Sequence, residues 1–198
     1  MKKTFSLLLA VGIVLTACNN NKPKETTIVS EDGKDKVTID LNKMQNAAAD
    51  MQKQTEELQK LTPLSLDQLK ALVPETLMGV QRSKYNTTSA MGTGVATAEY
   101  KMNDSTDVKL TVYDCAGPGG AGIYSMQYLG MYNVQSESDE EYTKTIDFMG
   151  GKAFEHCRKT RQECTITYFT GSRFLVSLEG NNVGADDLKK AAQELNIK

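Results

Sequence analysis

The sequence has 198 residues, with 23 Lys and Arg against 25 Asp and Glu. The resulting net charge of −2 argues against a nucleic-acid partner, because such partners need a basic patch on the protein. A single histidine, His156, excludes a multi-histidine metal site, and we predict neither a metal nor a cofactor. A chain of this length predicts one domain with additional segments.

The first residues have the features of an export signal. A cationic start, Met1–Lys3, precedes an apolar run from Leu7 to Leu15, which is shorter than the roughly 20 apolar residues of a spanning helix. The segment Leu15-Thr16-Ala17-Cys18 resembles the lipobox of bacterial lipoproteins. The resemblance implies that residues 1–17 are a signal peptide cut between Ala17 and Cys18. It also implies a diacylglycerol group on the Cys18 sulfur, and acyl chains such as palmitate that hold the protein on a membrane.

The residue after the lipobox bears on which membrane holds the protein. In the enterobacterial sorting rule, an aspartate at this position favours retention in the inner membrane. The chain has Asn19 instead, which resembles lipoproteins sent to the outer membrane. We therefore expect a cell-envelope protein on the periplasmic side of the outer membrane.

Three segments follow the anchor. Residues 18–40 are polar and without an apolar period, which predicts a disordered linker behind the lipidated cysteine. Residues 41–60 repeat apolar positions at helical spacing and predict an amphipathic helix. Pro63 ends that helix, and we predict one globular α+β domain over residues 61–198.

The predicted domain begins with a short helix. Ser65 is its expected N-cap, and Gln68 completes a capping box. The apolar period then changes to two, which predicts strands joined as hairpins. Gly150-Gly151 and Thr170-Gly171 are the turns of two such hairpins, and residues 186–197 predict a terminal helix. The predicted fold class is an antiparallel β-sheet of hairpins with helices packed on one face.

Three cysteines remain once Cys18 carries lipid. Cys157 and Cys164 flank a charged loop between two predicted strands, and a symmetric closure would place them opposite each other. Opposed strand positions are close enough for a bridge, so we predict a disulfide between them. Cys115 would be left unpaired. A thiol-dependent enzyme or redox switch at Cys115 would need His156 as its base, and this is one alternative function.

A glycine-rich segment follows Cys115. Its glycines match the G-x-G-x-x-G spacing of dinucleotide sites, but the neighbouring strands are predicted hairpins rather than a βαβ unit. We interpret it as a flexible turn that can border a binding site. Residues 123–134 predict a helix with a tyrosine stripe, which is either core or a recognition face. The candidate binding surface therefore comprises Gly117, Gly119, Gly120, Tyr124, Tyr128 and Tyr132.

From about Leu61 onward the chain resembles a group of uncharacterised bacterial envelope proteins, on residues 65–77 and 173–180. The resemblance implies no particular activity. The order of elements is also distantly similar to the PsbP/Mog1-like α+β sandwich, as an analogy of fold alone. We find no complete catalytic set and assign no catalytic residue. The leading hypothesis is a non-catalytic envelope lipoprotein that binds a protein or envelope component, and the alternative is a carrier of a small apolar or lipid ligand.

Overall fold

The computed structural model describes residues 25–29, 36–90, 92–131 and 134–197. The predicted signal peptide, Cys18 and Asn19 lie outside these residues. The chain divides into two compact units, residues 1–46 and residues 47–198. Within the described part, none of the helices is long and apolar enough to cross a membrane.

The first unit contains a β-hairpin where we predicted a linker without regular structure. Strands β1 (Glu25–Val29) and β2 (Lys36–Asp40) pair antiparallel. Both strands are rich in threonine, isoleucine and valine, whose branched side chains favour extended backbone. Helix α1 (Leu41–Lys60) follows directly over the range that the sequence period predicts, and its residues from Ala47 onward belong to the second unit.

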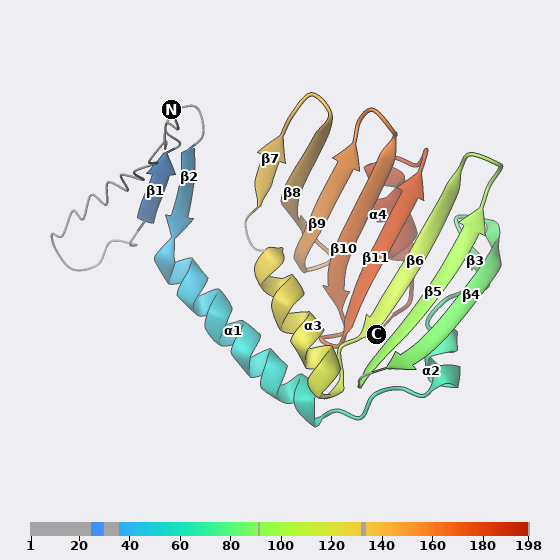
Figure 1. The fold of residues 1–198 in the computed structure, drawn as a ribbon, viewed down its shortest axis with the longest axis horizontal. Helices are drawn as coiled ribbons and strands as arrows, with labels where there is room; N and C mark the ends of the chain where they lie inside the picture. The colour runs from blue at the N-terminus through green and yellow to red at the C-terminus, as the bar shows by residue number, and fades with distance from the viewer. Residues whose placement is uncertain (1–24, 30–35, 91, 132–133, 198) are drawn as a thin grey trace, which may run out of the picture. The chain divides into compact units, whose positions relative to one another are not determined.

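A nine-stranded antiparallel sheet forms the second unit, in the order β3-β4-β5-β6-β11-β10-β9-β8-β7 (Figure 1). The mixed α+β class and the antiparallel sheet are thus confirmed. The strands are β3 (Thr76–Leu77), β4 (Val80–Ala90), β5 (Thr93–Lys101), β6 (Asp107–Asp114), β7 (Gln135–Glu137), β8 (Glu141–Phe148), β9 (Gly151–Arg158), β10 (Glu163–Thr170) and β11 (Phe174–Asn181).

Helices cover both faces of this sheet, which corrects the prediction of helices on one face. Helices α2 (Leu66–Ala71) and α4 (Ala185–Glu194) pack on one face, and α3 (Gly117–Gly130) lies on the other (Figure 1). Two consecutive residues of β10 show the division. The Tyr168 hydroxyl donates to the Ala192 carbonyl of α4 at 3.3 Å, whereas the Phe169 ring contacts Tyr124 of α3. Successive strand residues point to opposite faces, so each strand serves both layers.

We call the face under α2 and α4 the core face. It carries an apolar side chain at nearly every second position of the central strands, including the fully buried Leu110, Ile166 and Leu178. The start of α2 is fixed by the predicted capping box, because Ser65 accepts from the Gln68 N–H and the Gln68 side chain accepts from the Ser65 N–H.

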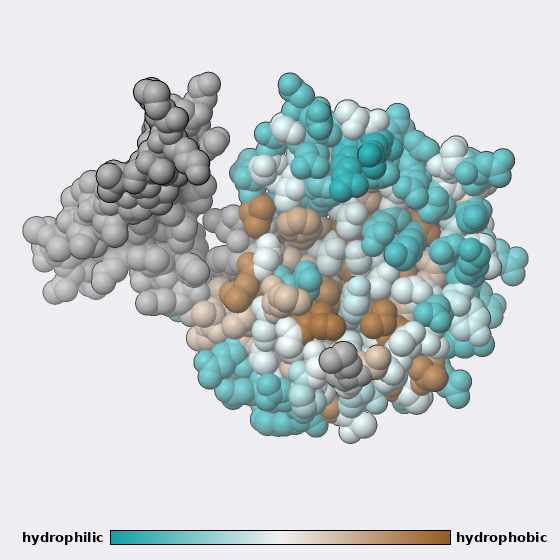
Figure 2. All heavy atoms as spheres, viewed as in Figure 1, coloured by the Kyte–Doolittle hydropathy of each residue, from teal (hydrophilic) through white to brown (hydrophobic). Residues whose placement is uncertain are grey.

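In the described part of the chain, helices cover one end of the opposite face, which we call the α3 face (Figure 1). There α3 and the second half of α1 enclose a smaller cluster that includes Leu58, Tyr124 and Leu175. Figure 2 shows this face, with hydrophilic side chains gathered toward the upper strand ends and more hydrophobic ones lower down and over α3.

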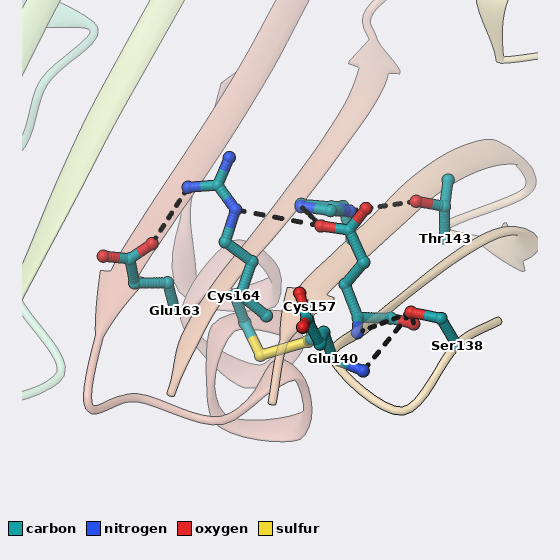
Figure 3. Close-up of polar contacts among 9 residues, drawn as sticks. Ser138, Glu140, Thr143, Cys157, Glu163 and Cys164 are labelled. Atoms are coloured by element: carbon teal, nitrogen blue, oxygen red, sulfur yellow. Dashed lines mark hydrogen bonds and ion pairs between the residues drawn. A yellow bond between two sulfur atoms is a disulfide. The ribbon is translucent and has the colours of Figure 1, made fainter. Parts of the chain in front are cut away.

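The predicted pair of cysteines lies on neighbouring strands. Cys157 of β9 and Cys164 of β10 are directly opposed in the register, and their sulfurs are 2.15 Å apart. The sequence expectation of a disulfide at these positions is therefore confirmed. The bridge closes the charged loop between the two strands (Figure 3).

Candidate ligand-binding site

The glycine-rich segment is the first half of helix α3 and not a flexible turn. The helix begins at Gly117 instead of Ile123, with Pro118 in its first turn, where the missing N–H costs nothing. Gly120 must be glycine, because a Cβ there would lie 2.4 Å from the backbone carbon of Cys115. Gly117 and Gly120 are buried and Gly119 is half-buried, so these three glycines position α3 on the sheet more than they form an exposed binding surface.

A buried ion pair fixes the start of α3 on the sheet. Arg173 donates from Nε and Nη2 to the two carboxylate oxygens of Asp114, at 2.7 and 3.0 Å. The same carboxylate accepts from the backbone N–H of Leu64 and Ala116. Burial alone would raise the pKa of Asp114, but the Arg173 hydrogen bonds and the two N–H donors outweigh it and lower that pKa.

Helix α1 holds α3 from its other side. Leu58 is fully buried against the α3 cluster, and the Thr55 and Ser125 hydroxyls lie 2.8 Å apart. The Gln54 amide also donates to the Ser172 carbonyl at 2.7 Å. The second half of α1 is therefore part of the layer that shapes the α3 face.

Two of the three predicted tyrosines come together with a residue that the sequence analysis missed. The rings of Tyr124 and Tyr128 are stacked with centroids 5.5 Å apart, and Phe169 of β10 lies 4.6 Å from Tyr124 and 6.3 Å from Tyr128. Tyr132 lies outside the described residues. The aromatic group thus joins the middle of α3 to the end of β10.

A cavity of about 680 Å³ opens beside this aromatic group. Helix α3, the turn between β8 and β9, and the end of β10 enclose it, and its volume falls within the usual range for small-molecule sites. We call it the tyrosine cavity. The lining residues are Tyr124, Tyr128, Met131, Asp147, Phe148, Met149, Gly150, Gly151, Lys152 and Phe169.

Few polar groups face this apolar lining. Tyr124 is only 7% exposed. Burial, together with the charges of nearby acidic groups, raises the pKa of Tyr124 to about 12, so the hydroxyl keeps its proton and can donate. Asp147 and Lys152 form an ion pair of 2.6 Å at the wall of the cavity.

Cys115 lies in an environment that suppresses thiol chemistry. It is fully buried, and burial raises the pKa of its thiol to about 12. The only histidine, His156, is on β9, three strands from β6 in the sheet, which corresponds to about 14 Å across the strands alone. His156 instead shares a hydrogen bond of 2.9 Å with Thr143. The described residues therefore contain no Cys115–His156 pair.

Polar side chains gather around the disulfide without forming a catalytic or metal site (Figure 3). Arg158 Nη1 donates to Glu163 at 3.1 Å, and the Ser138 hydroxyl accepts from the Glu140 N–H. Beneath α4, the buried Glu155 carboxylate is paired with Lys144 at 2.9 Å and with Lys189 at 3.1 Å. The Glu163 and Glu155 carboxylates each belong to an ion pair, and no metal-binding group of three or more ligands is found among the described residues.

Comparison with known proteins finds no match: no family model, no curated protein and no solved structure is similar to this chain. The resemblances to envelope proteins and to the PsbP/Mog1-like sandwich stay predictions. Tyr124 and Tyr128 were predicted from the sequence, whereas the opposite wall of the cavity was not. The predicted Gly150-Gly151 hairpin turn is shifted by one residue, to Met149-Gly150, and no local pattern indicated that this turn lies beside α3.

Proposed function

We propose that this protein is a lipid-anchored, non-catalytic binding module of the bacterial cell envelope, and that its ligand occupies the tyrosine cavity. One observation carries the proposal: aromatic and methionine side chains line a concave site that includes the buried residue Tyr124. Such sites commonly bind small molecules through apolar area and a few oriented polar groups.

Binding agrees with this lining better than catalysis does. The two charged residues at the cavity, Asp147 and Lys152, neutralise each other in an ion pair. The thiol of Cys115 is buried and stays protonated at neutral pH. General acid-base or nucleophilic catalysis needs an activated group within reach of the substrate, and neither arrangement supplies one.

The anchor part of the proposal rests on the lipobox at Cys18. Lipid on this cysteine would hold the domain on the periplasmic side of the outer membrane. Replacing Cys18 with serine should move the protein from the membrane pellet to the soluble periplasmic fraction, as judged by immunoblotting. A variant that stays in the pellet under high salt would contradict lipid anchoring.

The cavity part is tested with an apolar fluorescent probe, phenylnaphthylamine, on the full chain carrying Cys18→Ser. We expect saturable binding that Tyr128→Ala weakens about tenfold, because Tyr128 forms one wall of the cavity. Tyr85→Ala is the matched control, since Tyr85 is an exposed tyrosine on β4 away from the cavity. Equal affinity in both variants would rule out the cavity as the binding site.

A protein partner is the second candidate, and the outer side of α3 favours it. The helix has no charged residue, yet Met126 and Leu129 are 66% and 53% exposed. Exposed apolar side chains on a charge-free helix are a common feature of contact surfaces. Crosslinking in intact cells would test it, and a partner lost in a Met126→Ser, Leu129→Ser double variant would support it over the small ligand.

A further inference from the structure

We infer that the ligand of the tyrosine cavity has no net charge: an apolar body with an uncharged or zwitterionic polar end. The inference rests on the proposed function, because it takes the cavity as the binding site. The residues that carry it are Asp147 and Lys152, the two charged residues in the lining.

These two residues are fixed at the same level of the sheet. Asp147 of β8 is directly opposite Lys152 of β9, and both side chains lie on the α3 face. The Asp147 side chain is 86% exposed and that of Lys152 is 55% exposed. The ion pair therefore stands at the solvent side of the cavity, where the polar end of a ligand would lie.

The aromatic wall begins next to this pair. Ala153 of β9 pairs with Tyr168 of β10. The strands run antiparallel, so the residue before Ala153, Lys152, and the residue after Tyr168, Phe169, are neighbours on the α3 face. The Phe169 ring contacts the rings of Tyr124 and Tyr128, and Tyr124 is a buried residue. A ligand that fills the site would meet a charged pair at one end and aromatic rings along its length, which is the pattern of an amphiphile.

The ion pair disfavours a single charge on the ligand. An anion drawn to Lys152 would also approach the Asp147 carboxylate, and a cation at Asp147 would approach the Lys152 ammonium group. Because the two opposite charges are paired at 2.6 Å, they give an ion of either sign no net attraction to offset the hydration that the ion loses in the apolar cavity. A neutral group can hydrogen-bond to either residue, and a zwitterion can place its opposite charges against both.

Two probes of nearly the same shape separate these cases. Phenylnaphthylamine is neutral, and anilinonaphthalene sulfonate adds one negative charge to the same ring system. With the full chain carrying Cys18→Ser, we expect the neutral probe to bind about tenfold more tightly than the sulfonate. Asp147→Asn should reduce this ratio severalfold, and Lys152→Gln should increase it. Glu99→Gln is the matched control, because Glu99 belongs to an exposed ion pair with Lys84 elsewhere on the sheet.

The outcomes distinguish this inference from the proposed function. If the sulfonate binds as tightly as the neutral probe, or if Asp147→Asn leaves the ratio unchanged, the charge inference is overturned while the cavity stands as the binding site. If neither probe binds, the proposed function fails first.

Short-chain lipids then test the polar end of the ligand. Displacement of the neutral probe by dihexanoyl phosphatidylcholine but not by dihexanoyl phosphatidylglycerol supports a zwitterion. Displacement by neither supports an uncharged end, and equal displacement by both would overturn the inference.

Discussion

The two faces of the sheet are built from the same strands but differ in side chains and cover. On the core face, apolar residues of β5, β6, β11 and β10 pack under α2 and α4 into one continuous core. On the α3 face, the same strands align a row of hydroxyl side chains, Thr97, Thr111, Ser177 and Thr167, in consecutive register. Among the described residues of this face, the apolar cluster and the tyrosine cavity lie at the end near α3. We conclude that the core face supplies most of the stability, which leaves the α3 face available for binding.

The largest expected effect concerns the ion pair that joins the two layers. Replacing Arg173 with leucine leaves the fully buried Asp114 carboxylate without its cation, which should cost about 3–5 kcal/mol in the free energy of unfolding. Urea denaturation at neutral pH measures this loss. Lys109→Leu is the control, because Lys109 forms an exposed ion pair with Glu179, with Nζ and Oε2 3.8 Å apart. Its loss should change the free energy of unfolding by only about 0.5 kcal/mol.

The pH dependence of the same variant gives a second measurement. The pKa of Asp114 lies below its ordinary value of 3.8 in the folded protein, so the ionised group contributes stability above that pH and loses it as pH falls toward the folded pKa. The stability difference between wild type and Arg173→Leu should therefore be largest near neutrality and shrink on acidification, because Asp114 without Arg173 takes up a proton at a higher pH than in the wild type. A difference that grows on acidification would contradict the assigned direction of the pKa.

Adjacent residues of β10 test the comparison of faces directly. Ile166 is fully buried on the core face, so Ile166→Ala should destabilise by about 2–5 kcal/mol. Thr167 is half-buried on the α3 face and shares a hydrogen bond of 3.1 Å with Ser177, so Thr167→Ala should cost about 1 kcal/mol. Thermal and urea unfolding of both variants would decide. Equal losses would mean that the two faces contribute alike and that the division we describe is wrong.

Features with local signals were predictable from the sequence. The Ser65 capping box and the pairing of Cys157 with Cys164 depend on residues close together in the chain. The hairpin between β8 and β9 was also predicted, but its turn is Met149-Gly150 and not Gly150-Gly151, because Gly151 already pairs with Phe148. Period-two alternation likewise predicted the antiparallel hairpins, because residues on one face of a strand share one environment.

Features that depend on packing between distant segments were not predictable. The start of α3 at Gly117 was missed because a glycine run favours a turn by local propensity, while the close contact of Gly120 with Cys115 compensates only in the folded chain. The packing of α3 and α4 on opposite faces of the sheet was not predictable either, because helical periodicity does not indicate which face of a sheet a helix packs against. The wall that Phe169 gives the cavity follows from that placement.

The smallest expected effect concerns the contact between α1 and α3. It tests whether the layer formed by these two helices is less stable than the core strands. The Thr55 and Ser125 hydroxyls share one hydrogen bond of 2.8 Å across the two helices. In a double-mutant cycle, Thr55→Val and Ser125→Ala should each cost about 1 kcal/mol, with a coupling of similar size because they remove the same bond. Hydrogen exchange should then show faster exchange in α1 and α3 than in β6 and β11, since the layer opens before the core strands do. Uniformly increased exchange across the whole second unit would instead mean that both faces unfold as one cooperative unit, with the α3 layer no weaker than the core.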